Sequence, residues 1–274
     1  MKNPFTRLAT TVVLLAMAFN ALAQAPVTPA AYAGPRFPGG PDSLRALVYR
    51  SSRLIAPSLA RRAVVQIELQ DGQKPVNFKV LGPPQPAKSE LAKATQAAVR
   101  YLQAQMPAWQ PAPPQPEDKP GKNPRMLIAL NFASILSGQP YSYADQEPVF
   151  PYLAGLLQDQ RNANFKNNPE GTAVLAQMVA ARSTYSNLSD YAQRQVRYPA
   201  AALRGQQQGK VTAYFEVAEN GAIENAEILT SASTALDEEV LRAVRSLRPA
   251  STPALLRGQP VRVFYVVPFT FRIQ

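Results

Sequence analysis

The chain of 274 residues contains no cysteine and no histidine. This excludes histidine-based catalytic triads, cysteine nucleophiles, thiolate or imidazole metal sites, haem held by either residue, and iron–sulfur clusters. Chemistry based on two carboxylates or on a serine–lysine pair remains, and we consider Asp237, Glu238 and Glu239 for it. These acids open a predicted helix, where negative charge favours the helix dipole, and nothing places a second carboxylate across a cleft from them. The composition favours a protein that is not an enzyme and holds no metal or cofactor.

The chain also lacks an apolar run long enough to cross a membrane, which takes ~20 residues. The run from Leu8 to Ala23 is interrupted by polar residues, is preceded by Lys2 and Arg7, and ends in a small-x-small pattern. Because this is the pattern of a secretory signal peptide, we predict that residues 1–23 are removed on export. An uncleaved segment would instead anchor the protein in a membrane.

Basic residues outnumber acidic ones, and the formal net charge is +11. Loss of Lys2 and Arg7 with the signal peptide leaves 11 − 2 = +9, because residues 1–23 hold no acid. The basic residues are scattered, with no run beyond Arg61-Arg62, so nucleic acid is not an expected partner. Weak association with anionic membranes or with cell wall stays open.

Two segments share one order of predicted elements: helix, strand, strand, helix, strand. In the first, periodicity and turn residues predict helices at 43–55 and 87–106 and strands at 63–69, 76–81 and 126–132. In the second, they predict a helix at 190–196, which Tyr198-Pro199 ends, and strands at 211–217 and 223–229. A second helix capped at Thr234 follows, and a loop at 249–258 leads into the last strand. We therefore predict an internal duplication and an α+β fold of two small domains, each a three-stranded antiparallel sheet with a packed helix.

The remaining segments connect these domains. We divide the chain into a signal peptide (1–23), a flexible lead-in (24–36), a first domain (37–133), a linker of helices and loops (134–189) and a second domain (190–274). In the linker, helices are expected at 153–158 and 172–181. The proline-rich loop 107–120 is expected to be solvated, with Trp109 as a core anchor at its start.

The last strand, Val261 to Ile273, is the candidate binding element. Its odd-numbered positions are all apolar, whereas Arg262 and Thr270 take the other parity, so one buried face is expected. Pro268 has no N–H to donate, which places the strand at a sheet edge, and an exposed edge can accept a strand from a partner. The alternative is an ordinary core strand whose edge is covered by the first domain or by a second copy.

Several short patterns follow one another along the second domain: Tyr198-Pro199-x-x-Ala202, Gly205 and Gly209, Asn220-Gly221, Leu236-Asp237-Glu238-Glu239, Gly258-Gln-Pro-Val-Arg-Val263 and Val267-Pro268-Phe269-Thr-Phe271. As a set they resemble the TonB C-terminal domain family. The first domain resembles a degenerate copy, since it keeps Phe37-Pro38-Gly39-Gly40, Pro57, Trp109-x-Pro111 and Asn131-Phe132 but lacks the glycine pair before its first strand.

The resemblance implies the periplasmic part of an energy transducer. Such domains grip an extended segment of an outer-membrane TonB-dependent receptor by strand addition and transmit force from inner-membrane motor proteins. Carried over, the binding edge comprises Val261, Arg262, Val263, Phe264, Tyr265, Val266, Val267, Phe269 and Phe271, with Tyr198 and Pro199 flanking it. For Tyr198-Pro199 the alternative is a plain helix stop. A proline at Tyr265 should weaken docking if the Tyr265 N–H faces outward.

One departure from the family pattern concerns the segments that would transmit force. A transducer needs a membrane anchor and a long linker, whereas this chain has a signal-like N-terminus and a second folded domain in that place. The alternative function is a periplasmic scaffold without a transducing role, whose sheets pair with each other or in a homodimer, or which binds cell wall.

Overall fold

The computed structural model describes residues 31–53, 59, 61–82, 86, 88–113, 123–133, 135–150 and 184–273. The predicted signal peptide, most of the lead-in, and the linker helices expected at 153–158 and 172–181 lie outside the described residues. Within those ranges, none of the helices is both long and apolar enough to cross a membrane.

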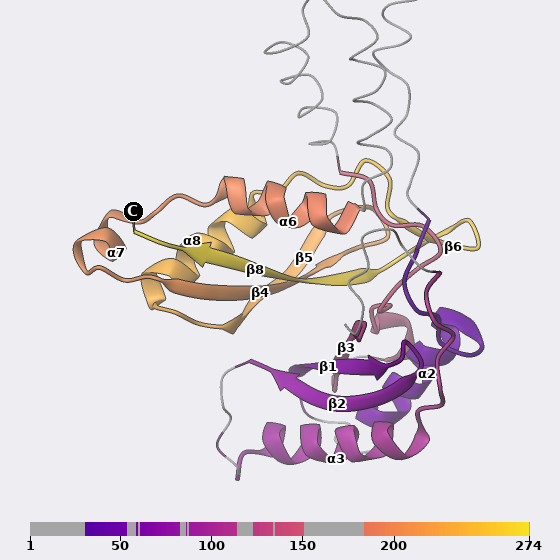
Figure 1. The fold of residues 1–274 in the computed structure, drawn as a ribbon. Coiled ribbons are helices and arrows are strands. Elements are labelled where there is room, and N and C mark those ends of the chain that lie inside the picture. Colours follow the sequence, from indigo (N-terminus) through magenta and orange to yellow (C-terminus); the bar gives the residue numbers. More distant parts are fainter. Residues whose placement is uncertain are drawn as a thin grey trace, which may run out of the picture.

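The first domain is a three-stranded antiparallel sheet with two helices (Figure 1). Its strand order is β2-β1-β3, so the first strand in sequence is the central one. The elements are α2 (Gly40–Arg53), β1 (Arg62–Gln70), β2 (Lys74–Leu81), α3 (Glu90–Gln105) and β3 (Arg125–Asn131). Both expected helices and all three expected strands of this domain are confirmed, with ends that shift by a few residues.

Local chemistry explains these elements. Asp71 and Gly72 join β1 to β2 with positive φ values of 55° and 72°, which these residue types tolerate best. The Ser89 hydroxyl caps α3 by accepting a hydrogen bond from the Ala92 N–H at 3.1 Å. Trp109 is 3% exposed and makes an edge contact with Phe37, so its expected role as a core anchor is confirmed.

The second domain repeats the strand order, with β5-β4-β8 in place of β2-β1-β3. Its elements are α6 (Thr184–Gln195), α7 (Ala200–Arg204), β4 (Gly209–Val217), β5 (Ile223–Thr230), α8 (Thr234–Arg245), β6 (Ala254–Leu256), β7 (Gln259–Val261) and β8 (Val263–Phe271). The α+β fold of two antiparallel three-stranded sheets with packed helices is therefore confirmed. A duplication of the sequence stays a prediction.

Three boundaries in the second domain differ from the expectation. Pro199 does not simply stop a helix, because α6 already ends at Gln195 and Pro199 is the N-cap of α7. The cap of α8 is Ser233 and not Thr234, since the Ser233 hydroxyl accepts from the Leu236 N–H. The loop expected at 249–258 contains β6 and leads through the positive-φ pair Arg257-Gly258 into β7, a short hairpin that hydrophobic periodicity could not detect.

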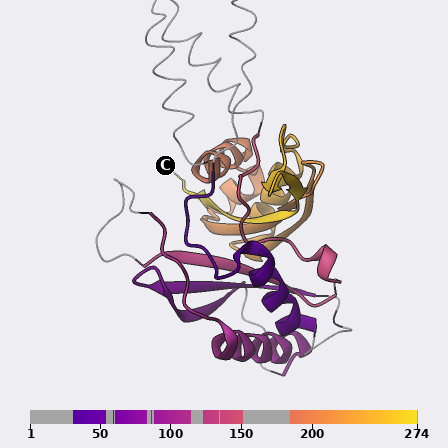
Figure 2. The same cartoon turned by 90° about the vertical axis from the view of Figure 1, so that its right-hand side faces the viewer.

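The two sheets pack face to face, with the helices on the outer sides (Figures 1 and 2). Each outer layer has its own core, in which α2 and α3 cover the first sheet and α6 and α8 cover the second. The inner faces meet in a third apolar cluster, formed by Val64, Ala129, Tyr214, Leu229, Phe264 and Val266. Among the described residues no strand of one sheet pairs with a strand of the other, so the domains join through side chains.

A connecting segment, residues 139–150, ties the two domains together. The Phe37 N–H donates to the Tyr143 hydroxyl at 2.9 Å, which fixes the segment to the first domain. Gln146 exchanges backbone hydrogen bonds with Leu255, and Val149 bridges to Thr252, which fixes it to the second. The segment therefore helps to set how the two sheets face each other.

Candidate functional site

The strand β8 lies at the edge of the second sheet. It pairs with β4 over nine consecutive positions, from Val217 opposite Val263 to Gly209 opposite Phe271. No other strand of the described residues pairs along its opposite side. The edge position inferred from Pro268 is therefore observed.

The backbone direction of each β8 residue follows from two contacts and one proline. The Thr270 N–H donates to the Gln193 side chain at 3.0 Å, and the Arg262 carbonyl accepts from the Tyr141 N–H at 2.8 Å. Pro268 shares their even parity and has no N–H to offer. Because N–H and C=O groups alternate sides along an antiparallel strand, even-numbered residues direct theirs away from β4.

The same alternation corrects one expectation about Tyr265. As an odd-numbered residue it directs its N–H toward β4, where it lies opposite Phe215. A proline at Tyr265 would therefore break the ladder that holds β8 in the sheet. It would not test docking on the outer edge.

Two described residues bound the outer edge of β8. At its start, Tyr141 forms an isolated parallel bridge with Val263. At its end, the Gln193 side-chain amide on α6 engages both backbone groups of Thr270, with 3.0 Å to the N–H and 3.4 Å to the carbonyl. The stretch from Phe264 to Phe269 lies between these two contacts.

The side chains of β8 are not buried on one face only, which corrects the expectation. The odd-numbered residues Val263, Tyr265, Val267, Phe269 and Phe271 enter the core of the second domain, as predicted. Phe264 and Val266 are buried as well, because the first sheet covers the other face. Only Pro268 and Thr270, beyond that cover, are exposed.

Val261 and Arg262 do not belong to β8. Val261 is part of β7, opposite Ala254 in the β6–β7 hairpin. Arg262 lies between the two strands, and its guanidinium contacts Glu216 at 3.0 Å and Glu224 at 2.7 Å. Burial opposes the charge of Arg262, but the hydrogen bonds to Glu224 and Glu216 outweigh it and raise its pKa.

Glu216 is the centre of a charge network between the two domains. Its carboxylate is 1% exposed and contacts Arg62 of β1 and Arg262, each at 3.0 Å. It also accepts from the Tyr214 hydroxyl at 2.7 Å and from the Asn225 amide at 2.8 Å. The network therefore joins β4 and Arg262, the residue just before β8, to Arg62 of the first domain.

Comparisons with known proteins concern mainly the second domain. Residues 194–273 match the family model of the Gram-negative bacterial TonB protein C-terminal. The second domain is therefore similar to TonB C-terminal domains. Among solved structures, the chain is similar to the NMR structure of the Helicobacter pylori TonB C-terminal domain, with 14% identity over 34% of this chain and 96% of that chain and a TM-score of 0.26. A search of curated proteins finds no match.

Tyr198 and Pro199 lie near the C-terminal end of β8 in the second domain. The Tyr198 ring meets the Phe271 ring edge-on with centroids 5.5 Å apart, and its hydroxyl donates to the Gln207 carbonyl. Pro199 starts α7. The structure thus brings Tyr198 next to the last residue of the predicted binding edge, and a role for either residue in binding stays a prediction.

Of the three acids considered for catalysis, Glu239 has structural contacts. Glu239 accepts from the Arg197 N–H and pairs with Arg242, and the hydrogen bond from Arg242 lowers the pKa of Glu239. The described residues contain no group of three or more acids, histidines or cysteines that could hold a metal ion.

Three residues that shape the edge were not singled out from the sequence. Tyr141 and Gln193 lie far from β8 in the chain, and only the fold brings them to it. Glu216 carried a signal, because it is the one acid inside the apolar strand Val211–Val217. A carboxylate in a strand with both faces buried needs cationic partners, which Arg62 and Arg262 supply.

Proposed function

We propose that this is a periplasmic, non-enzymatic protein whose TonB C-terminal domain binds an extended segment of an outer-membrane TonB-dependent receptor and couples it to energy-dependent transport. The observation that carries the proposal is the position of β8 at the sheet edge of the domain that matches the TonB family. The binding mode is strand addition, in which main-chain hydrogen bonds provide affinity and side-chain contacts provide selectivity.

The contacts at the two ends of β8 define a short docking window. Phe264 directs an N–H and a C=O outward, and Pro268 directs only a C=O. Tyr141 and Gln193 engage the backbone just before and just after these residues. A bound segment that makes ladder contacts here would therefore be only about five residues long, unless it displaces Gln193.

The first domain would form one wall of this window. A strand added beside β8 continues the sheet, so alternate side chains of the segment would point toward the first sheet. Phe264 and Val266 of β8 already pack in that direction. We infer that the first domain contributes to receptor selectivity, which gives it a role even if its own edges bind nothing.

Coupling to inner-membrane motor proteins depends on the N-terminus. A mature chain that starts at Gln24 would act as an adaptor, because it would have no segment within reach of the motor. A retained N-terminal segment would anchor the protein and permit direct force transduction. Mass spectrometry of the natively expressed protein distinguishes the two.

A scaffold without a receptor is the second candidate function, and the inter-sheet cluster favours it. Phe264 and Val266 face another domain of the same chain, as expected if the sheets serve mainly to hold the two domains together. In this case a homodimer or a cell-wall contact would use other surfaces. Sedimentation of the purified protein and a pull-down on peptidoglycan test these alternatives.

Cross-linking on β8 tests the receptor proposal directly. The chain has no cysteine, so a single one can be introduced at the exposed position Pro268. Peptides that span the periplasmic N-terminal segments of the receptors would each carry one cysteine at successive positions. We expect disulfides with Pro268→Cys at alternate peptide positions, because side chains of paired strands alternate between faces.

A matched control comes from the other edge of the same sheet. Thr230 is exposed on β5, so Thr230→Cys samples an edge that the proposal leaves empty. Equal cross-linking at both sites would reject β8 as the docking edge. If no receptor peptide binds at all by calorimetry, the scaffold function replaces the proposal.

A further inference from the structure

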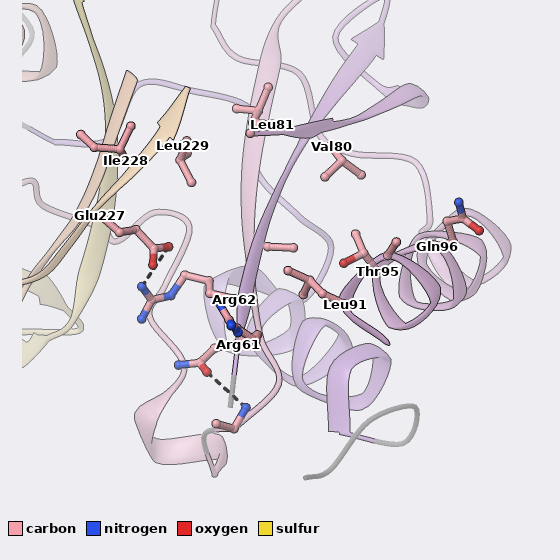
Figure 3. A pocket seen from close by; sticks show the side chains of 15 residues that line it. Arg61, Arg62, Val80, Leu81, Leu91, Thr95, Gln96, Glu227, Ile228 and Leu229 are labelled. Carbon is pink, nitrogen blue, oxygen red and sulfur yellow. Dashed lines mark hydrogen bonds and ion pairs between the residues drawn. The ribbon is translucent and has the colours of Figure 1, made fainter. Parts of the chain in front are cut away.

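A cavity of about 770 Å³ opens where the first domain meets β5 of the second (Figure 3). It lies beside the edge strands β2 of the first sheet and β5 of the second sheet. In the second sheet, β5 is the edge opposite to β8. Its volume is in the range of sites that hold small organic ligands. The cavity is separate from β8, where receptor docking is proposed.

The cavity wraps around the C-terminal end of β2, where apolar side chains line part of it. Successive strand residues point to opposite faces, so Val80 faces α3 and Leu81 faces the second sheet. Leu91 of α3 and Leu229 of β5 line the two sides (Figure 3). Val80 is 45% exposed, which is a high value for an apolar residue in a strand.

Small residues leave this space open. Ala63, Gly82, Ala92 and Ala133 all line it, and none fills it. Gly82 also allows the domains to approach, because a Cβ there would come within 3.2 Å of the Leu229 carbonyl oxygen. The space is therefore a consequence of how the two domains join.

The charged residues in the lining are two arginines and one glutamate. Arg62 and Glu227 form an ion pair at 3.2 Å, so they neutralise each other. Arg61 also lines the cavity, and its guanidinium makes no hydrogen bond or ion pair within the described part of the chain. In the same part of the chain, the Nε of Arg62 is buried without a hydrogen-bond partner. The lining thus offers apolar side chains, an exposed guanidinium that forms no ion pair with the described residues, and one buried N–H without an acceptor there.

We propose that this cavity binds a small amphipathic carboxylate, with its apolar chain between Val80 and Leu91 and its carboxylate on Arg61. Guanidinium groups bind carboxylates with charge-assisted hydrogen bonds. A free fatty acid of medium length has this chemistry. The site would give the junction of the two domains a ligand of its own, independent of the β8 edge.

Calorimetric titration of the full chain with decanoate tests the site. We expect saturable binding, weakened about 10-fold by Arg61→Gln and largely kept by Arg61→Lys, because a charge-assisted hydrogen bond is lost only in the first. Ala92→Phe should abolish binding by filling the cavity. Arg100→Gln, an exposed change on the same helix outside the lining, is the control and should bind as the wild type does.

The outcomes separate the site from adventitious binding. Unchanged unfolding midpoints would show that the variants are folded. The proposal is overturned if decanoate does not bind, if 1-decanol binds as tightly as decanoate, or if Ala92→Phe binds as the wild type does. If a hydrophobic peptide with a free C-terminus binds and decanoate does not, the ligand class is a peptide and the fatty-acid proposal is wrong. None of these results bears on receptor docking at β8.

Discussion

The Glu216 carboxylate of β4 lies 3.0 Å from the Arg62 guanidinium of β1, so a buried ion pair joins the central strands of the two sheets. Arg262 contacts the other oxygen of the same carboxylate, also at 3.0 Å. The Arg62 guanidinium stacks over the Tyr214 ring at 4.3 Å. One carboxylate thus connects the first domain, the second sheet and the residue that precedes the candidate binding edge.

Removing the charge of Glu216 should be strongly destabilising. Glu216→Gln leaves Arg62 and Arg262 without their shared anion, and breaking a buried pair from one side costs about 3–5 kcal/mol. Urea unfolding followed by circular dichroism measures the change. The control is Glu219→Gln, because Glu219 is 49% exposed, lies 3.4 Å from Arg262, and should contribute less than about 1 kcal/mol. Similar losses in the two variants would contradict the central role of Glu216.

The apolar contact between the sheets predicts that the two domains unfold together. Phe264 lies in the inter-sheet cluster with Val64 and Ala129 of the first domain, and Phe264→Ala should cost about 3–5 kcal/mol. Trp109 is the only tryptophan and lies in the core of the first domain, so its fluorescence reports on that domain alone. We expect Phe264→Ala to lower the unfolding midpoint seen by Trp109, although the substitution lies in the second domain.

A matched control for Phe264 lies just after β8. Ile273 is 41% exposed, and Ile273→Ala should change the free energy of unfolding by no more than about 0.5 kcal/mol. An unchanged Trp109 transition in Phe264→Ala, with a lowered circular dichroism midpoint, would show that the sheets do not stabilise each other.

Two glycines with the same backbone conformation should respond differently to alanine. Gly221 has φ +81°, and a Cβ there would come within 2.4 Å of the Ala250 carbonyl oxygen. Gly258 has φ +77° but has nothing within 4 Å. We expect Gly258→Ala to cost about 1 kcal/mol from backbone strain alone, and Gly221→Ala to cost clearly more because the loop at Ala250 must move. Thermal unfolding of both variants measures the difference, and equal losses would contradict the close approach.

Local patterns predicted the elements of the fold but not how the domains join. Asp71-Gly72 and Asn220-Gly221 mark the hairpins by residue chemistry that depends only on neighbours in the chain. The face-to-face packing depends on distant segments, although Phe264 and Val266 gave a hint. Both are even-numbered residues of the last strand. If only the odd-numbered face were buried, the even-numbered positions would be expected to be polar, yet these two are apolar. The first sheet explains them, and no local pattern identifies which surface covers a strand.

The edge itself could be predicted, but its limits could not. Pro268 places β8 at an edge because the proline lacks an N–H, which is a local property. The positions of Tyr141 and Gln193 on that edge result from the packing of the connecting segment and of α6, which the sequence does not specify locally. The direction of the Tyr265 N–H also required the register with β4.

Glu147 predicts a pH dependence of stability. It lies in the connecting segment, and burial raises the pKa of its carboxyl from 4.5 to about 7. The folded state therefore favours the protonated acid, so this group destabilises the fold progressively as pH rises from about 4.5 to about 7 and by a constant amount above that. The full effect is on the order of 3 kcal/mol.

Glu147→Gln should remove this dependence, because the amide has no proton to lose. We expect the variant and the wild type to have nearly equal free energies of unfolding at the acid end of the range, and the variant to be the more stable at pH 7.5. Glu239→Gln is the contrasting control: the hydrogen bond from Arg242 lowers the pKa of Glu239 from 4.5, so its contribution is lost only below about pH 4.5 and the effect of this variant should be constant over the measured range. Urea unfolding between pH 5 and pH 7.5 measures both, and parallel curves for wild type and Glu147→Gln would show that this carboxyl is ionised in the folded protein throughout that range.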